Sequence, residues 1–563
     1  MPKSTLCATA MAVAVALAGV QAASAAPPPP VASGGAQILQ IPPSPTPDRV
    51  IPDIRLDRGG PARDAGPAGP KVVVRSLRVS GETRFPEAKL IAVTGFRPGE
   101  ALDLRDLRLM AARISAFYNR RGYFLAQAYV PAQEMRDGAI TIVVIEARYG
   151  KIRIDNHTNL STGLARSILR GLDSGDVVAS APLERRLLIL SDIPGVVVKS
   201  TLSPGATVGS SDLTVALTPG PRVSGSIDFD NGGDVYSGAN RLGATVNIND
   251  PTGHGDQITL RALSSFDGLD YGRAAYQVQV QDATVGVSYT ALDYRLHGAF
   301  ASLGANGTAE VASVYASYPL IRSYDNNLVL LGDLDDRTFQ DKETAVFSVI
   351  DKSEYALEYG ISGDHHDRLG GGGWDQYSLG YTLGDLDIRT ASALAVDAAG
   401  ARAEGGYVKL SYSVSRLQTV AGPLSVYGLI RGQAASKNLD VSEKMELGGA
   451  YAVRAYPEGE IYGDDGYVAT LEARLMLPPA PAPLPGRLQL IGFVDTGSAA
   501  TNHDPWFPGP NRETVSGAGV GANWVAPSNF LVKVTYAHTL GGAVGVPGAV
   551  SGGRVWVQLV KFF

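Results

Sequence analysis

From Pro221 to Phe563 the chain consists of short segments in which apolar and polar residues alternate. A period of two indicates strands with one apolar and one polar face, and helical periodicity is almost absent here. Sixteen such segments are predicted. They span residues 222–229, 241–248, 257–263, 275–280, 284–289, 309–318, 328–334, 355–362, 376–382, 407–414, 424–431, 467–475, 488–494, 515–524, 530–536 and 554–563.

An even number of amphipathic strands, with segments of roughly ten residues, is typical of outer-membrane barrels. Lipid offers no partner to unpaired backbone groups, so strands cross a membrane only within a closed barrel. Sixteen strands also enclose a lumen. We therefore predict a mainly β fold, with a 16-stranded antiparallel transmembrane β-barrel over residues 220–563. A large soluble β-sandwich or propeller is the alternative for this pattern.

The last segment ends on an aromatic residue, Phe563, which shares an apolar face with Val555, Val557 and Leu559. Lys561 interrupts that face near its end, where a lysine side chain can reach the membrane interface. A final strand of this kind resembles the assembly signal of bacterial outer-membrane barrels. Phe563 is the predicted signal residue.

Residues 1–25 have the pattern of a secretory signal peptide: Lys3, then an apolar stretch, then the small residues Ala23-Ser24-Ala25. The single cysteine, Cys7, lies inside this peptide. Leu6 before it is too large for lipoprotein processing. We expect a mature chain without a thiol, and hence without a disulfide, a thiolate metal site or a cysteine nucleophile.

Residues 26–71 are rich in Pro, Gly and Ala, a composition that forms no core and predicts an extended linker. The stretch from Ala36 to Gln40 allows a short helix. The sequence does not decide whether this linker holds a plug helix.

Two α+β units are predicted between the linker and the barrel, at residues 72–148 and 149–219. The first has a strand at 72–79, a helix ending near Val93, a helix from the N-cap Asp103, and strands at 123–130 and 139–148. The apolar face of its second helix is predicted to contain Leu104, Leu107, Ala111, Ile114 and Tyr118.

The second unit repeats the order, and a repeated supersecondary unit indicates an array rather than one enzyme domain. Sheet edges in such units can accept a strand from an unfolded chain, because backbone hydrogen bonds ignore sequence. The alternative is that the units only space and brace the barrel. The predicted elements are a strand at 151–155, helices at 164–172 and from near Pro182, and strands at 196–202 and 213–217.

Composition agrees with an all-β membrane protein. Charged residues are 18% of the chain, and 66 glycines suit many turns. A net charge of −6 argues against a nucleic-acid binder, which is normally basic.

The two α+β units resemble POTRA domains, and residues 191–195 with 202–205 resemble the second POTRA module of two-partner secretion transporters. The barrel resembles the ShlB/FhaC/HecB family, the TpsB transporters. The resemblance covers nearly the whole mature chain. Its barrel segments are residues 229–233, 249–251, 255–257, 318–323, 443–449, 453–457, 463–464 and 493–497.

In that family an arginine on a long loop folded back into the barrel pairs with an aspartate of an FxDxG strand motif. The resemblance implies that Arg454 pairs with Asp495. A guanidinium can hold a carboxylate through two hydrogen bonds, and a carboxylate facing lipid would cost a few kcal/mol, so Asp495 should face the lumen. Arg454 as a solvated loop charge is the alternative. The supporting motif residues are Val453, Ala455, Tyr456, Pro457, Phe493 and Gly497.

Ala455 departs from the family pattern, which has glycine there. If that glycine is needed for a positive φ, Ala455 changes the loop tip.

Other motifs predict no chemistry. Gly517, Gly519 and Gly521 alternate in a strand without a following helix, so we expect them to admit a closely packed loop rather than a phosphate. His365-His366 is expected on an exposed rim loop. No Walker, HExxH or nucleophile-elbow motif is present. We expect no enzyme activity, cofactor or metal.

The resemblance implies an outer-membrane transporter of the haemolysin/adhesin secretion-activation type, with its POTRA domains in the periplasm. They would capture an unfolded exoprotein, which the barrel would secrete. Expected partners are this cargo, outer-membrane lipids and the barrel assembly machinery, with no nucleic acid. A BamA-type assembly factor and a passive porin with periplasmic modules are the alternatives. The sequence identifies neither the cargo nor the oligomeric state.

Overall fold

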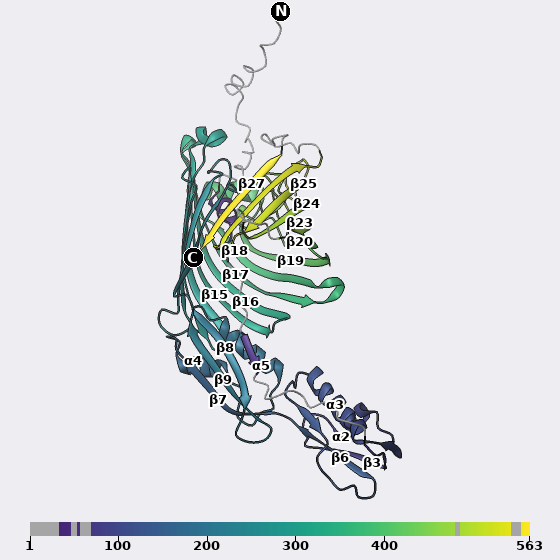
Figure 1. Cartoon of the computed structure of the whole chain (residues 1–563). Helices are drawn as coiled ribbons and strands as arrows, with labels where there is room; N and C mark the ends of the chain where they lie inside the picture. Colours follow the sequence, from purple (N-terminus) through teal and green to yellow (C-terminus); the bar gives the residue numbers. More distant parts are fainter. Residues whose placement is uncertain (1–32, 47–52, 57–68, 479–484, 542–552) are drawn as a thin grey trace, which may run out of the picture.

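The protein is a closed β-barrel with an arm of two α+β modules at one end (Figure 1). The computed structural model describes residues 33–46, 53–56, 69–478, 485–541 and 553–563. The predicted signal peptide lies outside the described residues. Among the described helices, none is long and apolar enough to span a membrane.

Each of the sixteen predicted segments overlaps one strand of the barrel, which confirms the predicted 16-stranded antiparallel fold. Neighbouring strands pair in sequence order, and the last strand pairs with the first. The strands are β10 (Val223–Asp230), β11 (Arg241–Asn249), β12 (Gln257–Ser264), β13 (Leu269–Val280), β14 (Ala283–Arg295), β15 (Ala305–Arg322), β16 (Asn326–Glu343), β17 (Ser348–Asp367), β18 (Gly373–Ile388), β19 (Gly405–Ala421), β20 (Leu424–Ala435), β23 (Asp465–Met476), β24 (Arg487–Ala500), β25 (Arg512–Val525), β26 (Phe530–Thr539) and β27 (Arg554–Phe562).

Many strands are longer than predicted. The segment at 328–334 is part of the 18-residue β16, and that at 355–362 is part of the 20-residue β17. The apolar alternation stops where a strand leaves the lipid, as at the exposed Asp336. Backbone pairing continues past that point because it does not depend on apolar side chains.

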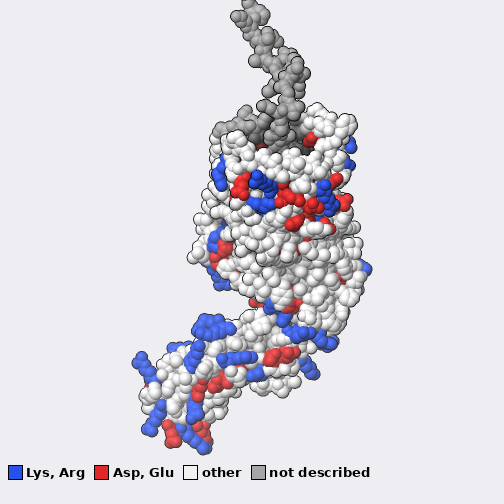
Figure 2. Space-filling view, turned by 180° about the vertical axis from the view of Figure 1, so that it is seen from behind, with Lys and Arg blue, Asp and Glu red and all other residues white. Residues whose placement is uncertain are grey.

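The barrel wall alternates as a membrane barrel should. On β23 the outward Leu471 is 59% exposed, whereas its neighbour Glu472 is 5% exposed and faces the lumen. Figure 2 shows a broad uncharged band on the barrel wall, with charged side chains gathered above it. An apolar outer band and a polar interior match a barrel spanning lipid.

The barrel closes at the C-terminus. Gly225 and Phe563 exchange two backbone hydrogen bonds of 3.1 Å. A side chain at Gly225 would meet the Phe563 ring at 2.7 Å, so the last residue fits only because residue 225 is glycine. Lys561 turns to the nearby Ser528 carbonyl, as expected for a lysine reaching the interface. The role of Phe563 as an assembly signal stays a prediction.

The first module packs two helices on a three-stranded sheet of order β3-β6-β5. Asp103 and Asp106 form a capping box at the start of α3. Leu104 was predicted on its buried face but is 45% exposed, because it is the first helical residue and lies at the rim; Met110 and Phe117 are buried instead. The elements are β2 (Val72–Val74), β3 (Ser76–Ser80), α2 (Glu87–Thr94), β4 (Glu100–Leu102), α3 (Leu104–Arg120), β5 (Gln127–Tyr129) and β6 (Ala139–Ile145).

Two predicted elements of these modules need correction. The strand expected at 123–130 is only the three residues of β5, because a tight turn of hydrogen bonds holds residues 121–126 against the end of α3. The helix expected at 164–172 ends at Ile168, where Leu169 and Leu172 continue as turns that remain buried. The module boundaries at 148 and 219 stay a prediction.

The second module has a sheet of order β1-β8-β9-β7. β1 comes from the linker and pairs in parallel with Lys199–Leu202 of β8. The linker is therefore not extended throughout: it contains this strand, which was not predicted, and helix α1, which overlaps the short helix allowed at Ala36 to Gln40. Helix α1 (Gly34–Leu39) precedes β1 in the linker and is not part of this module. The elements of the module are β1 (Asp53–Leu56), β7 (Arg148–Asn156), α4 (Thr162–Ile168), α5 (Ser180–Ser191), β8 (Val196–Pro204) and β9 (Ser210–Pro219).

The second module is held against the arm-side turns of the barrel. Arg186 of α5 donates two hydrogen bonds of 2.9 Å to Asp282, in the β13–β14 turn. Asp192, at the end of α5, pairs with Arg322 at 2.7 Å. These contacts fix the direction in which the arm leaves the barrel.

Candidate functional site

The candidate site lies where a long connection folds back into the barrel. Residues 436–464 join β20 to β23 and include the short antiparallel strands β21 (Met445–Glu446) and β22 (Tyr462–Gly463). We call residues 436–464 the inserted loop. Its apolar residues form one buried cluster with the barrel wall. The cluster contains Leu447, Ala452, Val453, Ala455, Tyr456, Ile461, Val468, Ile491, Phe493, Ala499, Val515 and Ala537.

The inserted loop satisfies its own backbone groups at its tip. Val453 donates to the Leu447 carbonyl at 2.9 Å, and Tyr456 donates to the Val453 carbonyl at 3.0 Å. Leu447 donates to Ile461 at 3.0 Å, across the stem. A buried loop needs such partners, because an unpaired backbone group costs free energy away from water.

The structure brings Arg454 and Asp495 into contact. Arg454 donates from Nε to Oδ2 and from Nη2 to Oδ1 of Asp495, both at 2.8 Å, and its backbone N–H donates to Oδ2 at 3.2 Å. The Asp495 side chain is fully buried, and that of Arg454 is 11% exposed. Two parallel hydrogen bonds fix both position and orientation of the loop tip on the lumen face of β24.

Further groups surround the guanidinium. Its third nitrogen donates to Glu472 of β23 at 2.8 Å, and its carbon lies 3.4 Å from the centre of the Phe493 ring. Trp556 of β27 donates its indole N–H to the Arg454 carbonyl at 2.7 Å. Removing one partner of a buried pair typically costs about 3–5 kcal/mol, so this network can hold the inserted loop firmly.

Small residues on the wall make room for the loop. A methyl group at Gly517 would collide with the Cβ of Ala455, and one at Gly497 would meet Val453 at 3.2 Å. One at Gly519 would meet the Phe493 ring at 2.5 Å. Of the alternating glycines of β25, Gly517 therefore admits the loop tip, whereas Gly519 makes room for the Phe493 ring of the neighbouring strand β24.

Ala455 has an ordinary negative φ and does not occur among the residues with a left-handed backbone. The backbone at this position therefore does not need a glycine, and the methyl group of Ala455 packs on Gly517. Pro457 follows Tyr456, which is 3% exposed and belongs to the loop cluster.

Sequence reasoning missed Glu472, Thr470 and Trp556. Glu472 pairs in register with Phe493, and Thr470 with Asp495, to which it donates at 2.9 Å. The alternation within 467–475 marks residues 470 and 472 as lumen-facing, so that signal was available. No pattern in the sequence indicated that Trp556 contacts the inserted loop.

A second set of charges holds the stem of the inserted loop. The 3-10 turn η5 (Val441–Glu443) places Glu443 against Arg337 of β16 and Lys409 of β19. Asp440 pairs with Lys352 of β17 at 2.8 Å. The loop is thus fixed at its tip to β23 and β24, and at its stem to β16, β17 and β19.

Helix α1 lies inside the barrel, against both the wall and the inserted loop (Figure 1). Its first N–H, from Gly34, donates to Asp341 of β16 at 2.7 Å. Gln40 donates to the hydroxyl of Tyr462 at 2.9 Å. Gly35 packs so closely against Ser442 that a methyl group on Gly35 would lie 3.1 Å from the backbone N of Ser442. The linker therefore places a helix in the lumen of the barrel.

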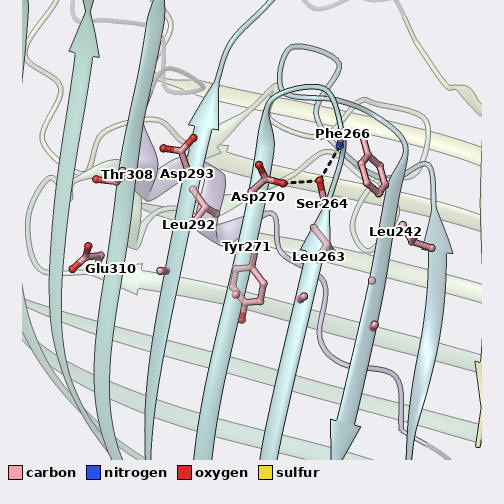
Figure 3. Close-up of a pocket in the computed structure, with 15 residues that line it drawn as sticks. Leu242, Leu263, Ser264, Phe266, Asp270, Tyr271, Leu292, Asp293, Thr308 and Glu310 are labelled. Atoms are coloured by element: carbon pink, nitrogen blue, oxygen red, sulfur yellow. Dashed lines mark hydrogen bonds between the residues drawn. The ribbon is translucent and has the colours of Figure 1, made fainter.

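Two polar cavities flank the segment that follows α1. One of about 580 Å³ lies toward Arg273 and Asp335, and one of about 390 Å³ lies toward Arg431 and Gln433. A third hollow, of about 560 Å³, lies at strands β11 to β15 and is drawn in Figure 3. It contains none of the predicted site residues.

No group of three or more metal-ligating side chains occurs among the described residues. His365 and His366 lie within β17 rather than in a loop, because the strand pairing extends to Asp367. The ring of His366 stacks on Trp374, with centroids 5.5 Å apart.

Two family models match the chain. The model of the haemolysin secretion/activation protein ShlB/FhaC/HecB matches residues 209–524, and that of the ShlB-type POTRA domain matches residues 72–147.

Relatives by sequence include the heme/hemopexin transporter protein HuxB of Haemophilus influenzae, 29% identical over 68% of each chain. The outer membrane transporter CdiB of Escherichia coli is 24% identical over 84% of this chain and 83% of the relative. A solved structure of CdiB from Escherichia coli matches with a TM-score of 0.70 at 21% identity, covering 90% of this chain and 93% of that one.

BamA from Haemophilus ducreyi, lacking POTRA domains 1–3, matches with a TM-score of 0.53 at 13% identity, over 87% of this chain and all of that one. At these identities the solved structures show a shared fold alone. The ShlB/FhaC/HecB model covers more than half of the chain, and it shows that this chain belongs to the haemolysin secretion/activation protein family ShlB/FhaC/HecB.

Proposed function

We propose that the barrel is shut in this structure by helix α1 and the inserted loop, and that the Arg454–Asp495 pair holds the loop in place. The chain is a two-partner secretion transporter of the outer membrane, with its POTRA domains in the periplasm. The bidentate Arg454–Asp495 contact carries the proposal, because it joins the loop tip to the wall without water.

The cargo, a secreted exoprotein, must pass the barrel in an extended form. We infer that the second POTRA module receives it by strand addition at β8, where a cargo strand takes the place of β1, which pairs with that edge in this structure. Strand addition relies on backbone hydrogen bonds and therefore suits an unfolded chain of any sequence.

The first module is less suited to strand addition than the sequence indicated. At the β5 edge, Ala128 donates its backbone N–H to Ser115 of α3 at 2.8 Å. At the β3 edge, Val79 donates to the Glu87 carboxylate at 3.0 Å. The side chains of Ser115 and Glu87 thus already bind backbone N–H groups with which an added strand would have to form hydrogen bonds.

We propose no catalytic role for the chain. Folding of the cargo outside the cell would supply the driving force. Outer-membrane lipids around the uncharged band of Figure 2, and the barrel assembly machinery during biogenesis, complete the proposed partners.

The test is charge reversal at Arg454 in cells that express the transporter with its exoprotein. Arg454→Glu should sharply reduce the exoprotein in the medium while a heat-modifiable barrel remains in the membrane. Arg487→Glu, on the arm-side end of β24, is the matched control, with the same charge change outside the inserted loop. Normal secretion by Arg454→Glu would contradict the proposal.

The two alternatives predict different results. A BamA-type factor would lower the amounts of other barrel proteins when depleted. A passive porin would conduct steadily and would not need the POTRA modules for export.

A further inference from the structure

The first POTRA module has an unusual charge distribution. Between residues 72 and 147 there are 11 Lys and Arg and 8 Asp and Glu, whereas residues 220–563 contain 24 and 37. The module is therefore basic, although the chain as a whole is acidic. On the face shown in Figure 2, the arm has both blue and red side chains along its surface, in contrast to the uncharged band of the barrel.

Most carboxylates of this module bind backbone N–H groups of the module itself. Glu146 accepts from Thr83 at 2.8 Å and from Arg84 at 2.9 Å, inside the fold. These carboxylates accept hydrogen bonds from backbone amides, and Glu146 also lies 3.9 Å from the guanidinium of Arg148, which is outside helix α3. They are Glu87, Glu100, Asp103, Asp106 and Glu146.

The cations gather along helix α3. Its solvent face includes the exposed Arg105 and Arg120, separated by the small, exposed Ala112. At its C-terminal end Arg121 lies 3.8 Å from the centre of the Phe117 ring. Lys89 of α2 lies 5.9 Å from the same ring. We call these four cations, Lys89, Arg105, Arg120 and Arg121, the basic face.

The aromatic platform keeps part of the basic face in place. Phe85 and Phe117 pack edge to face with centroids 5.0 Å apart, and Phe117 is 5% exposed. Cations stacked on such rings lose less freedom when they bind a carboxylate. A basic surface that is partly held in place fits an anionic partner, and it attracts that partner over a Debye length.

The position of the module favours cargo over lipid as that partner. In Figure 1 the first module lies at the end of the arm away from the barrel, beyond the second module. The barrel marks the membrane, so the basic face lies away from it, in the compartment from which cargo arrives.

We propose that the basic face of the first POTRA module binds an acidic, unfolded segment of the exoprotein before the chain reaches β8. This inference rests on the proposed function and adds the chemical class of the docking segment. Charge attraction would then bring the segment to the first module, and strand addition would retain it at the second module.

The test uses the full-length protein in zwitterionic nanodiscs and two fluorescent synthetic peptides. The peptides share length and apolar residues and differ only in carrying Glu or Lys at alternate positions. Anisotropy should show the acidic peptide binding at least about 10-fold more tightly at about 50 mM NaCl, with most of this preference lost at about 300 mM.

The double variant Arg105→Glu/Arg120→Glu should abolish the preference, and Arg105→Lys/Arg120→Lys should retain it. Arg75→Glu/Arg78→Glu is the matched control: both residues are exposed, and Arg78 lies on the sheet face away from the helices. It has the same charge change and should keep most of the preference.

Equal binding of both peptides, or equal loss in the control, would overturn the charge preference and leave cargo capture standing. Binding of neither peptide by the wild type would overturn capture itself. If phosphatidylglycerol vesicles compete with the acidic peptide through the same two arginines at lower concentration, the face is a lipid site and the inference fails. The Arg454→Glu secretion assay is independent of all three results.

Discussion

Arginines and carboxylates meet in opposite ways in the lumen and in the first POTRA module. In the lumen, Arg454 contacts Asp495 and Glu472, and Arg337 contacts Glu443. In the module, the buried Glu146 binds backbone N–H groups, while arginines such as Arg105 remain at the surface.

The difference follows from access to water. A guanidinium enclosed between a loop and a barrel wall must be paired, because an isolated buried charge is too costly. A guanidinium on a surface helix is solvated, so it needs no carboxylate partner within the protein and can bind another molecule. The same residue type therefore holds a loop against the barrel wall in one region and stays at the surface in the other.

The largest effect should come from breaking the lumen pair on its acidic side. Asp495→Asn leaves Arg454 buried with Glu472 as its remaining carboxylate partner, and losing such a pair costs about 3–5 kcal/mol. We expect the inserted loop to leave its position more often, seen as more frequent opening in planar-bilayer recordings. Thr470→Val, which removes only a neutral hydrogen bond to Asp495, is the milder comparison. Unchanged conductance in Asp495→Asn would show that the loop is held elsewhere.

A steric change on the wall should have the next largest effect. Gly517→Val forces a side chain into the space that Ala455 fills, and overpacking typically costs about 1–3 kcal/mol. Opening should increase, and Ala455→Gly should partly reverse it. Ala455→Gly alone should behave as wild type because Ala455 has no positive φ. A defect in that single variant would contradict this account of the loop tip.

In the first POTRA module, the environment of Glu146 indicates that the stability of the module depends on pH. Burial raises its pKa, but hydrogen bonds from Thr83, Arg84 and Tyr118 outweigh this and lower it below the usual 4.5. A carboxyl with a lowered folded pKa stabilises the fold above its unfolded pKa, and the stabilisation is lost as the pH falls through the folded value.

Deuterium exchange of residues 72–147 in the full-length protein should therefore increase as the pH falls below about 4.5, once corrected for intrinsic exchange. Glu146→Gln should cost about 1–3 kcal/mol at neutral pH and flatten the profile. A profile identical to wild type would show that Glu146 does not control this module.

The smallest effect is expected at the surface of α3. Arg105→Gln exchanges a solvated residue and should change the stability of the module by less than about 0.5 kcal/mol. Exchange of residues 72–147 should match wild type, in contrast to Glu146→Gln. A clear loss of protection would show that Arg105 supports the fold rather than a binding surface.

Much of the fold could be predicted from the sequence because the alternation within each barrel strand shows which residues face lipid and which face the lumen. The alternation of apolar and polar residues at 467–475 or 515–524 needs no distant partner to be read. Strand ends were missed because pairing outlasts the apolar pattern, as in β16 beyond residue 334. The approach of Arg454 to Asp495 followed only from a family resemblance, since nothing local to either residue indicates the other.

The sequence by itself determined the number of barrel strands, their faces and the order of modules, because these depend on short-range periodicity. Tertiary structure alone decided that β1 occupies the edge of β8, that α1 rests on Ser442, and that Trp556 contacts the loop tip. Each of these joins residues more than a hundred positions apart. Such contacts depend on shape and on the pairing of buried charges, which no local pattern encodes.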